Sequence, residues 1–272
     1  MVRSPGWLAP FYFLGFQYPT ASRNLFPLLV KIGPDSIRTT AVYSRYMRKH
    51  NREPEVMQFD AGARGGWIGP SDAKKVLLYM HGGAYVSSCH PMHVAILADL
   101  VTALLDKTSD FAVFLLEYGL VPRATYPDQL IQAATALKYL IDAKDLHPED
   151  IFIAGDSAGG NLAIALIFHI LHPHSAVPKI TLAQGKKLGG AFLVSPWVTF
   201  NSDSISMKRN RDKDFPDADM LHDSAMLFQG DASIDNYIDP LNAQPDWWRD
   251  LIIHDICVVA GEYEIFRDDI LK

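Results

Sequence analysis

The sequence predicts an α/β protein with a mostly parallel sheet, helices on both faces of that sheet and a small cap. Short apolar runs rich in strand-forming residues alternate with segments whose apolar residues recur at helical spacing. Strands that are apolar throughout are typical of a parallel sheet buried on both faces. The 272 residues, 49% hydrophobic and 21% charged, are enough for one domain of this kind.

Strands and helices are expected in alternation along the middle of the chain. Strands are predicted at residues 76–80, 111–116, 151–154, 191–194 and 256–260. Helices are predicted at residues 92–105, 129–143 and 158–171, the second opened by Tyr126-Pro127-Asp128 and the third terminated by Pro173. Right-handed crossovers place the C-terminal ends of parallel strands along one edge of the sheet, where α/β proteins form their sites.

Two regions do not follow this alternation, within what we interpret as a single domain over residues 1–272. Residues 1–50 precede the sheet and are rich in aromatic residues, and residues 200–250 are polar and include the pair Trp247-Trp248. Both are predicted to fold over the edge of the sheet as an N-terminal cap and a second cap insertion. Packing of their aromatic side chains against the sheet is the alternative.

Charge and composition exclude several classes of function. A net charge of −6 argues against a nucleic-acid-binding protein, which would carry a clustered basic face. The basic run at residues 45–52 is interpreted as a solvated helix face, with a phosphate-binding patch as the alternative. Cys89 and Cys257 resemble neither a disulfide framework nor a metal site, so that a reducing, cytoplasmic compartment and no metal are expected.

The apolar stretch at residues 7–16 is too short for a membrane span, and Pro10 and Gly15 interrupt it. It also lacks a charged leader and a cleavage site, so a secretory signal is not expected. A peripheral contact with lipid stays open.

Ser157 lies where a nucleophilic serine is expected in a protein of this class. It stands between a predicted strand and a predicted helix, within Gly155-Asp156-Ser157-Ala158-Gly159. This G-x-S-x-G pattern places the serine on a sharp, strained turn at the edge of the sheet. The helix that starts at Ala158 points its N-terminal amides toward a developing oxyanion. A glycine-rich turn that merely contains a serine is the alternative.

A second glycine motif, His81-Gly82-Gly83, ends the strand predicted at residues 76–80. Glycines let backbone N–H groups face an acyl oxygen, and Gly82, Gly83 and Ala158 would together form an oxyanion hole. Losing one such donor costs about 3 kcal/mol of transition-state stabilisation. His81 itself is interpreted as a residue that fixes this loop rather than as a general base.

Further motifs in a fixed order give the chain a family resemblance. They are Tyr118-Gly119-Leu120-Val121-Pro122, Tyr126-Pro127 and Ser195-Pro196-Trp197, besides the two glycine motifs. With them, over residues 55–270, the chain resembles the hormone-sensitive-lipase-like group of α/β-hydrolases, marked by HGG and GDSAGG motifs. The segment at residues 261–269 is most similar to fungal members, including steryl-acetate hydrolases and hydrolases of secondary-metabolite and toxin clusters.

The resemblance implies the α/β-hydrolase fold and a serine carboxylic-ester hydrolase without a cofactor. Ser157 would be the nucleophile, and Glu264 takes the place of the family's catalytic aspartate. Glu262, two residues earlier, is the competing candidate for the acid. The expected partner is a small-to-medium apolar ester, and the residues expected to bind it are Tyr85, Asp156 and Trp197.

The family's general base is a histidine that follows the acid after one more helix and strand. All ten histidines of this chain precede Glu264. We therefore expect a C-terminally truncated chain without the last helix and strand, in which residues 256–260 form an exposed sheet edge open to self-association. His169, His172 and His174 are excluded as the base by the length of their helix, about 20 Å at 1.5 Å per residue. His90, His93 and His222 remain as substitutes, although pocket or surface roles are the alternative.

The functional hypotheses that remain are therefore distinct. The chain is an esterase acting through an acyl-enzyme, a catalytically inactive remnant that binds an apolar ligand or a protein, or an acyltransferase or cyclase using the same serine. Ester specificity, oligomeric state and the choice between hydrolysis and acyl transfer do not follow from the sequence. A peroxisomal location would require a C-terminal signal other than Ile270-Leu271-Lys272.

Overall fold

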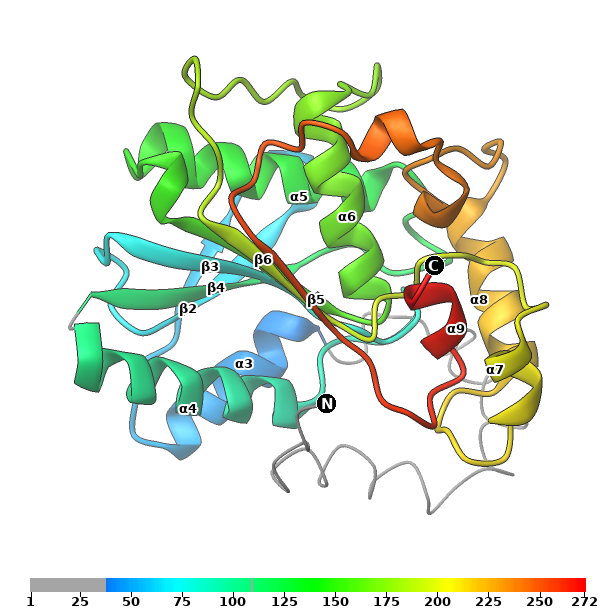
Figure 1. The fold of residues 1–272 in the computed structure, drawn as a ribbon. Coiled ribbons are helices and arrows are strands. Elements are labelled where there is room, and N and C mark those ends of the chain that lie inside the picture. The colour runs from blue at the N-terminus through cyan, green and yellow to red at the C-terminus, as the bar shows by residue number, and fades with distance from the viewer. Residues whose placement is uncertain (1–37, 109) are drawn as a thin grey trace.

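A seven-stranded sheet in the order β1-β2-β4-β3-β5-β6-β7 forms the centre of the computed structural model, which describes residues 38–108 and 110–272 (Figure 1). The strands are β1 Glu55–Gln58, β2 Arg64–Ile68, β3 Lys75–Met80, β4 Phe111–Glu117, β5 Ile151–Asp156, β6 Gly190–Val194 and β7 Ile256–Val259. β1 pairs antiparallel with β2, and β2 with β4, whereas the strands from β4 to β7 pair in parallel. The predicted mostly parallel sheet is confirmed.

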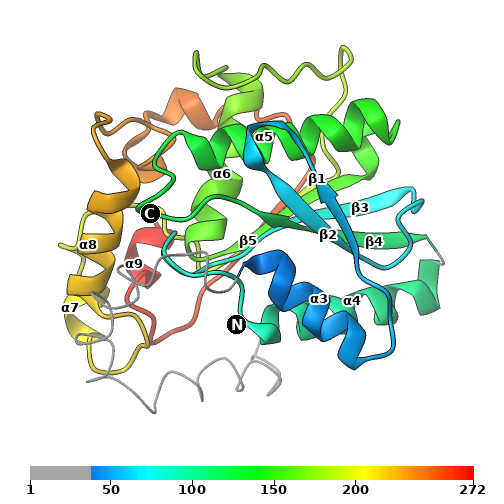
Figure 2. The same cartoon turned by 180° about the vertical axis from the view of Figure 1, so that it is seen from behind.

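Helices cover both faces of this sheet. The helices are α3 Thr39–Lys49, α4 Pro91–Thr108, α5 Asp128–Lys138, α6 Ala158–Leu171, α7 Ile205–Arg209, α8 Ala218–Gln229 and α9 Arg267–Ile270. α3 and α4 lie on one face, and α5 and α6 lie on the other (Figures 1 and 2). Among the described helices, none is both long enough and apolar enough to cross a membrane.

The apolar runs of the central strands follow from these two layers. In β3, Val76, Leu78 and Met80 belong to the core that α6 shares, whereas Leu77 points to the core on the side of α3 and α4. Successive side chains of a strand point to opposite faces, so a strand with helices on both sides must be apolar throughout. Each predicted strand agrees with an observed one to within two residues at either end.

The hairpin of β1 and β2 was not predicted, because neither strand has an apolar run. β2 begins Arg64-Gly65-Gly66, and glycine is usually unfavourable in a strand. Here the glycines make room for aromatic rings. A Cβ at Gly65 would lie 2.2 Å from the ring of Phe114, and one at Gly66 would lie 2.6 Å from the ring of Tyr43. The hairpin therefore depends on contacts with distant residues.

The described parts of the two predicted caps differ in position. α3, from the predicted N-terminal cap, packs against α4 and β2 on one face of the sheet. Residues 1–37 of that region lie outside the described residues. The second region forms α7 and α8, with the 3₁₀ turns Pro240–Asn242 and Pro245–Trp248. α7, α8 and α9 gather beyond the C-terminal ends of the parallel strands (Figure 1).

β7 ends the sheet within the described chain. Its side chains are largely exposed, with Ile256 and Val258 at 40% and 46% of their full accessible area. Phe192 of the neighbouring β6 is 44% exposed. Self-association through this edge stays a prediction.

Candidate active site

Ser157 occupies the junction between β5 and α6 in a strained backbone conformation. Its φ of 50° and ψ of −118° lie in a region that residues with side chains rarely adopt. Three backbone hydrogen bonds hold this conformation. The N–H of Ser157 donates to the carbonyl of Val194 at 3.0 Å, and the carbonyl of Ser157 accepts from the N–H groups of Asn161 and Trp197 at 3.0 and 2.9 Å.

The glycines around Ser157 allow α6 to begin directly against the neighbouring loop. A Cβ at Gly159 would lie 2.0 Å from the carbonyl oxygen of Met80 and 2.6 Å from that of His81. A Cβ at Gly155 would lie 2.3 Å from the carbonyl oxygen of Gly159. All of these obstacles are backbone atoms, which cannot rotate away. The first turn of α6 is therefore in contact with the end of β3.

The loop after β3 presents backbone amides next to this turn. Gly83 and Ala84 have positive φ values of 118° and 51°. The N–H of Gly82 donates to Oδ1 of Asp156 at 2.8 Å, so this amide is already engaged and cannot also serve an oxyanion. In the described structure no acceptor is bonded to the N–H groups of Gly83, Ala84 or Ala158. In this conformation the Gly82 amide is therefore occupied, whereas the amides of Gly83, Ala84 and Ala158 are open; the set of oxyanion donors stays a prediction.

Asp156, expected to bind substrate, instead joins three elements of the site. Its Oδ1 also accepts from the hydroxyl of Tyr79 at 2.7 Å, and its Oδ2 lies 3.2 Å from Nε2 of His93 in α4. In the neutral ring, Nδ1 of His93 accepts from the N–H of His90, so Nε2 carries the proton that points to Asp156.

The pKa values of this pair move in opposite directions. Burial alone would raise the pKa of Asp156, but the charge of His93 and the hydrogen bonds from His93, Tyr79 and Gly82 lower it to about 2. Burial alone would lower the pKa of His93, but the charge and hydrogen bond of Asp156 raise it above its ordinary value. Asp156 is therefore a carboxylate at neutral pH, and His93 stays protonated to a higher pH than a free histidine.

His81 fixes the same loop from its other side. The side chain is fully buried, and burial lowers its pKa to about 4. Nδ1 lies 2.7 Å from the carbonyl oxygen of Gly82, which can only accept, so Nδ1 carries the proton. Nε2 then accepts from the hydroxyl of Thr39, at the start of α3, at 2.8 Å. His81 is thus neutral and fully engaged.

Glu264 is held inside the protein by one hydrogen bond that leaves half of its carboxylate unpaired. Oε1 accepts from the hydroxyl of Ser195 at 2.7 Å. Oε2 is buried and has no hydrogen-bond partner in the described part of the chain. Burial raises the pKa of Glu264, although the Ser195 hydroxyl opposes this shift. Glu262, the competing candidate, is exposed to solvent.

The loop that carries Glu264 is positioned by the segment around α7. The side-chain amide of Asn210 donates to the carbonyl of Glu264 at 2.9 Å. Ile265 is held at both backbone groups, since its N–H donates to Oδ2 of Asp214 at 2.8 Å and its carbonyl accepts from the hydroxyl of Ser206 at 2.6 Å. The second predicted cap region therefore holds in place the backbone of the loop that carries Glu264.

All ten histidines lie within the described chain, and none of them is hydrogen-bonded to the hydroxyl of Ser157 or to Glu264. Of the substitutes considered above, His93 is occupied by Asp156 and His90. His90 is exposed and accepts from the N–H of Met92, and His222 is exposed on α8. The described chain thus has a serine on a strained turn beside unbonded amides, and a carboxylate bonded to Ser195, with no histidine hydrogen-bonded to either the serine hydroxyl or the carboxylate.

Tyr85 and Trp197, also expected to bind substrate, are buried. Tyr85 is 0% exposed, stacks on Phe228 with a centroid distance of 3.8 Å and donates to Oδ1 of Asn161. Trp197 is 2% exposed. Neither side chain offers a surface to a ligand in this conformation, because both are buried.

Sequence reasoning missed two supporting residues. Asn161 donates to the carbonyls of Trp197 and Ile238 besides accepting from Tyr85, so it ties the serine turn to the second cap region. Ser195 was named only as part of the Ser195-Pro196-Trp197 motif. Its hydroxyl directly follows β6, next to β7, which leads to Glu264, and this position could have predicted the hydrogen bond to Glu264. Among the described residues no group of three or more His, Cys, Asp or Glu side chains could hold a metal ion.

Comparisons with known proteins agree with this geometry. A family described as "alpha/beta hydrolase fold" matches residues 77–272. An esterase of Acinetobacter venetianus is 28% identical over 192 residues, which are 69% of this chain and 57% of that protein. The carboxylesterase/phospholipase LipF of Mycobacterium tuberculosis is 31% identical over 162 residues, 57% of this chain and 39% of LipF.

The chain therefore spans about half of the length of these curated relatives or less. Among solved structures, an esterase from the bacterial hormone-sensitive lipase family superposes with a TM-score of 0.66 at 21% identity, covering 99% of this chain and 82% of that one. At this identity the superposition concerns the fold alone. The family match, which covers most of the sequence, shows that this chain belongs to the α/β-hydrolase fold family.

Proposed function

We propose that this protein is a serine carboxylic-ester hydrolase that works through an acyl-enzyme at Ser157. The observation that carries the proposal is the strained turn of Ser157, which lies beside backbone N–H groups that have no acceptor. A serine on such a turn projects its hydroxyl from the edge of the sheet, where a carbonyl carbon can reach it. The amides of Gly83, Ala84 and Ala158 are the proposed donors to the oxyanion.

Glu264 is the proposed acid of this site, in preference to Glu262. The unpaired, buried Oε2 is an acceptor for the N–H of an imidazole ring, and an acceptor left unpaired inside a protein costs about 1–3 kcal/mol. No described histidine is hydrogen-bonded to Glu264 or to the hydroxyl of Ser157, so none is in the position of the general base. We propose that an imidazole placed between Glu264 and Ser157 completes the triad.

The reaction follows from these roles. The imidazole takes the proton of the Ser157 hydroxyl as its oxygen attacks the ester carbonyl, and the resulting oxyanion is held by the backbone amides. The protonated imidazole then gives its proton to the departing alcohol, which leaves an acyl-serine. Water, activated by the same imidazole, releases the acid and restores the serine. Each oxyanion amide contributes about 3 kcal/mol.

The proposed substrate is a small-to-medium apolar ester. The names of the relatives, an esterase and a carboxylesterase/phospholipase, support an ester as the reacting group. A role in fungal secondary-metabolite or toxin biosynthesis stays a prediction from the segment around Glu264. Acyl transfer or cyclisation would use the same acyl-serine, and access of water to it decides between these reactions.

The experiment that tests the proposal is turnover of p-nitrophenyl acetate and butyrate with and without added imidazole. We propose that a small imidazole reaches the unpaired Oε2 of Glu264 and acts as the base. We expect turnover that rises with imidazole concentration above the uncatalysed imidazole reaction and is absent in Ser157→Ala. Glu264→Gln should lower the imidazole-dependent rate, whereas the matched exposed variant Glu262→Gln should not.

The outcomes separate the hypotheses. Serine-dependent turnover without imidazole would mean that a histidine of this chain moves into place, and His90→Gln, His93→Gln and His222→Gln would identify it. Turnover that is the same in Ser157→Ala, with and without imidazole, would reject the esterase proposal for this chain and favour a binding role. An equal effect of Glu262→Gln and Glu264→Gln would reject the assignment of the acid.

A further inference from the structure

The first described helix is basic in a protein whose net charge is −6. Between residues 38 and 52 the chain has no acidic residue. Arg38, Arg45 and Arg48 are separated by seven and three residues, which places them near one face of α3. The proposed ester hydrolysis does not use this concentration of charge. It therefore needs a separate explanation.

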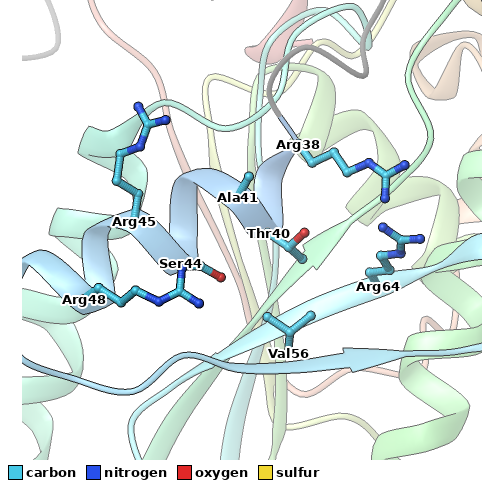
Figure 3. A pocket seen from close by; sticks show the side chains of 8 residues that line it. All are labelled: Arg38, Thr40, Ala41, Ser44, Arg45, Arg48, Val56 and Arg64. Carbon is cyan, nitrogen blue, oxygen red and sulfur yellow. The ribbon is translucent and has the colours of Figure 1, made fainter.

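These arginines line an open cavity of about 600 Å³ between α3 and the hairpin of β1 and β2 (Figure 3). Arg64 of β2 provides a fourth guanidinium group, and Figure 3 shows Arg38 and Arg64 extending into the same end of the cavity, with Arg48 and Ser44 at the other. The complete lining is Arg38, Thr40, Ala41, Ser44, Arg45, Arg48, Val56 and Arg64. It contains no carboxylate.

The carboxylate of Glu117, at the end of β4, lies beside this cavity and is bonded mainly to Thr40. Its Oε2 accepts from both the N–H and the hydroxyl of Thr40 at 2.7 Å. Its Oε1 lies 3.9 Å from Nη1 of Arg64, so the two form a long ion pair without a hydrogen bond. Arg45 and Arg48 form no ion pair with any described residue.

We propose that this cavity binds the phosphate group of an organic phosphate monoester. Guanidinium groups suit phosphate because each offers parallel N–H donors that match two oxygens, and the three terminal oxygens of a monoester can accept from several arginines at once. The hydroxyl of Ser44 adds a neutral donor at the same wall. The apolar side chains of Ala41 and Val56 provide a surface for the organic part, and the cavity is larger than a bare phosphate needs.

The site is independent of the proposed esterase activity. It lies between α3 and the β1–β2 end of the sheet, and β4 and β3 separate β2 from β5, which carries Ser157. At about 4.8 Å per strand, this separation is about 14 Å. A phosphate held by the arginines is therefore a second ligand rather than part of the ester at Ser157.

The test is a binding titration of the purified chain with glycerol phosphate, by calorimetry in a chloride buffer of fixed ionic strength. Arg48→Gln/Arg64→Gln removes two of the guanidinium groups, and we expect the dissociation constant to rise at least about tenfold. Lys208→Gln/Arg209→Gln is the matched control, because it removes the same charge from α7, outside the cavity. The exposed single variant Arg48→Gln replaces the double variant if loss of Arg64 impairs folding.

A parallel flotation assay distinguishes a free phosphate from a lipid headgroup. It uses vesicles of phosphatidylcholine, with and without phosphatidic acid, whose headgroup is also a phosphate monoester. Arginine-dependent binding of glycerol phosphate without vesicle binding assigns a soluble ligand. Arginine-dependent flotation with phosphatidic acid assigns the same chemistry to a membrane lipid. The proposal is overturned if neither probe binds, or if the α7 control weakens binding as much as the cavity variant does.

Discussion

Replacing Asp156 by Asn should destabilise the protein by an amount that depends on pH. The carboxylate has a pKa of about 2, against an ordinary value of 3.8, and the difference corresponds to about 2 kcal/mol of stability. This contribution is present above pH 3.8 and is lost as the pH falls toward 2. An Asn side chain can still accept from Tyr79 and Gly82, but it carries no charge to pair with His93.

The contribution of His93 has the opposite dependence. Because Asp156 raises the pKa of His93, the stability that protonation brings is complete below its ordinary value of 6.5 and is lost as the pH rises through the folded value. The charge pair is therefore fully formed between about pH 4 and 6.5. The difference between the parent and Asp156→Asn should be largest there and smaller at about pH 9, where His93 is neutral and the parent has no charge pair to lose.

Thermal unfolding monitored by circular dichroism at about pH 5.5 and about pH 9 measures this difference. We expect Asp156→Asn to lower the melting temperature by about 5 °C at the lower pH and by clearly less at the higher pH. The exposed variant Asp142→Asn, which loses only a surface ion pair with Lys138, should show a small effect at both. A difference that stays constant or grows from pH 5.5 to 9 would refute the role of the His93 charge.

Three further changes test other parts of the site. Gly159→Ala places a methyl group against the carbonyl of Met80 and should lower the free energy of unfolding by about 3 kcal/mol or prevent folding, as measured by urea denaturation. Asn161→Ala leaves several buried groups unpaired and should also cost about 3 kcal/mol in the same assay. Ser195→Ala removes the hydrogen bond that lowers the pKa of Glu264, so this carboxyl should titrate at higher pH in NMR spectra.

Two of these changes, Gly159→Ala and Ser195→Ala, have a control in the same chain. Gly190→Ala adds the same methyl group with its nearest obstacle at 3.3 Å, and a loss equal to that of Gly159→Ala would contradict the steric argument. Exposed Ser175→Ala should leave the titration of Glu264 unchanged. If Ser195→Ala leaves it unchanged as well, the hydrogen bond does not influence this carboxyl.

The sequence was sufficient for the parts of the fold that rest on local pattern. The apolar runs of β3, β4 and β5 identified the sheet, because a strand between two layers of helices has no polar side. The pattern around Ser157 identified the turn, because only glycine fits at Gly155 and Gly159. The hairpin of β1 and β2 escaped notice, since its glycines are explained only by rings brought from β4 and α3.

The chemistry of individual groups was harder to predict. Nothing in the motif His81-Gly82-Gly83 reveals that the first glycine amide is taken by Asp156, because that contact joins residues 74 positions apart. The burial of Glu264 and the exposure of Glu262 likewise depend on how the loop is held by Asn210 and Asp214. Long-range hydrogen bonds decide which members of a motif are free to act.

The first turn of α3 has a consequence for where this protein can be divided. Thr39 bonds to His81 and to the N–H of Cys89, and Thr40 bonds to Glu117. The family match begins only at residue 77, yet the loop after β3, which the match contains, is held by a hydrogen bond to Thr39, almost forty positions earlier. A shortened protein that starts at residue 77 would lose β1, β2 and this hydrogen bond. The folding unit therefore includes residues that precede the region matched by the family.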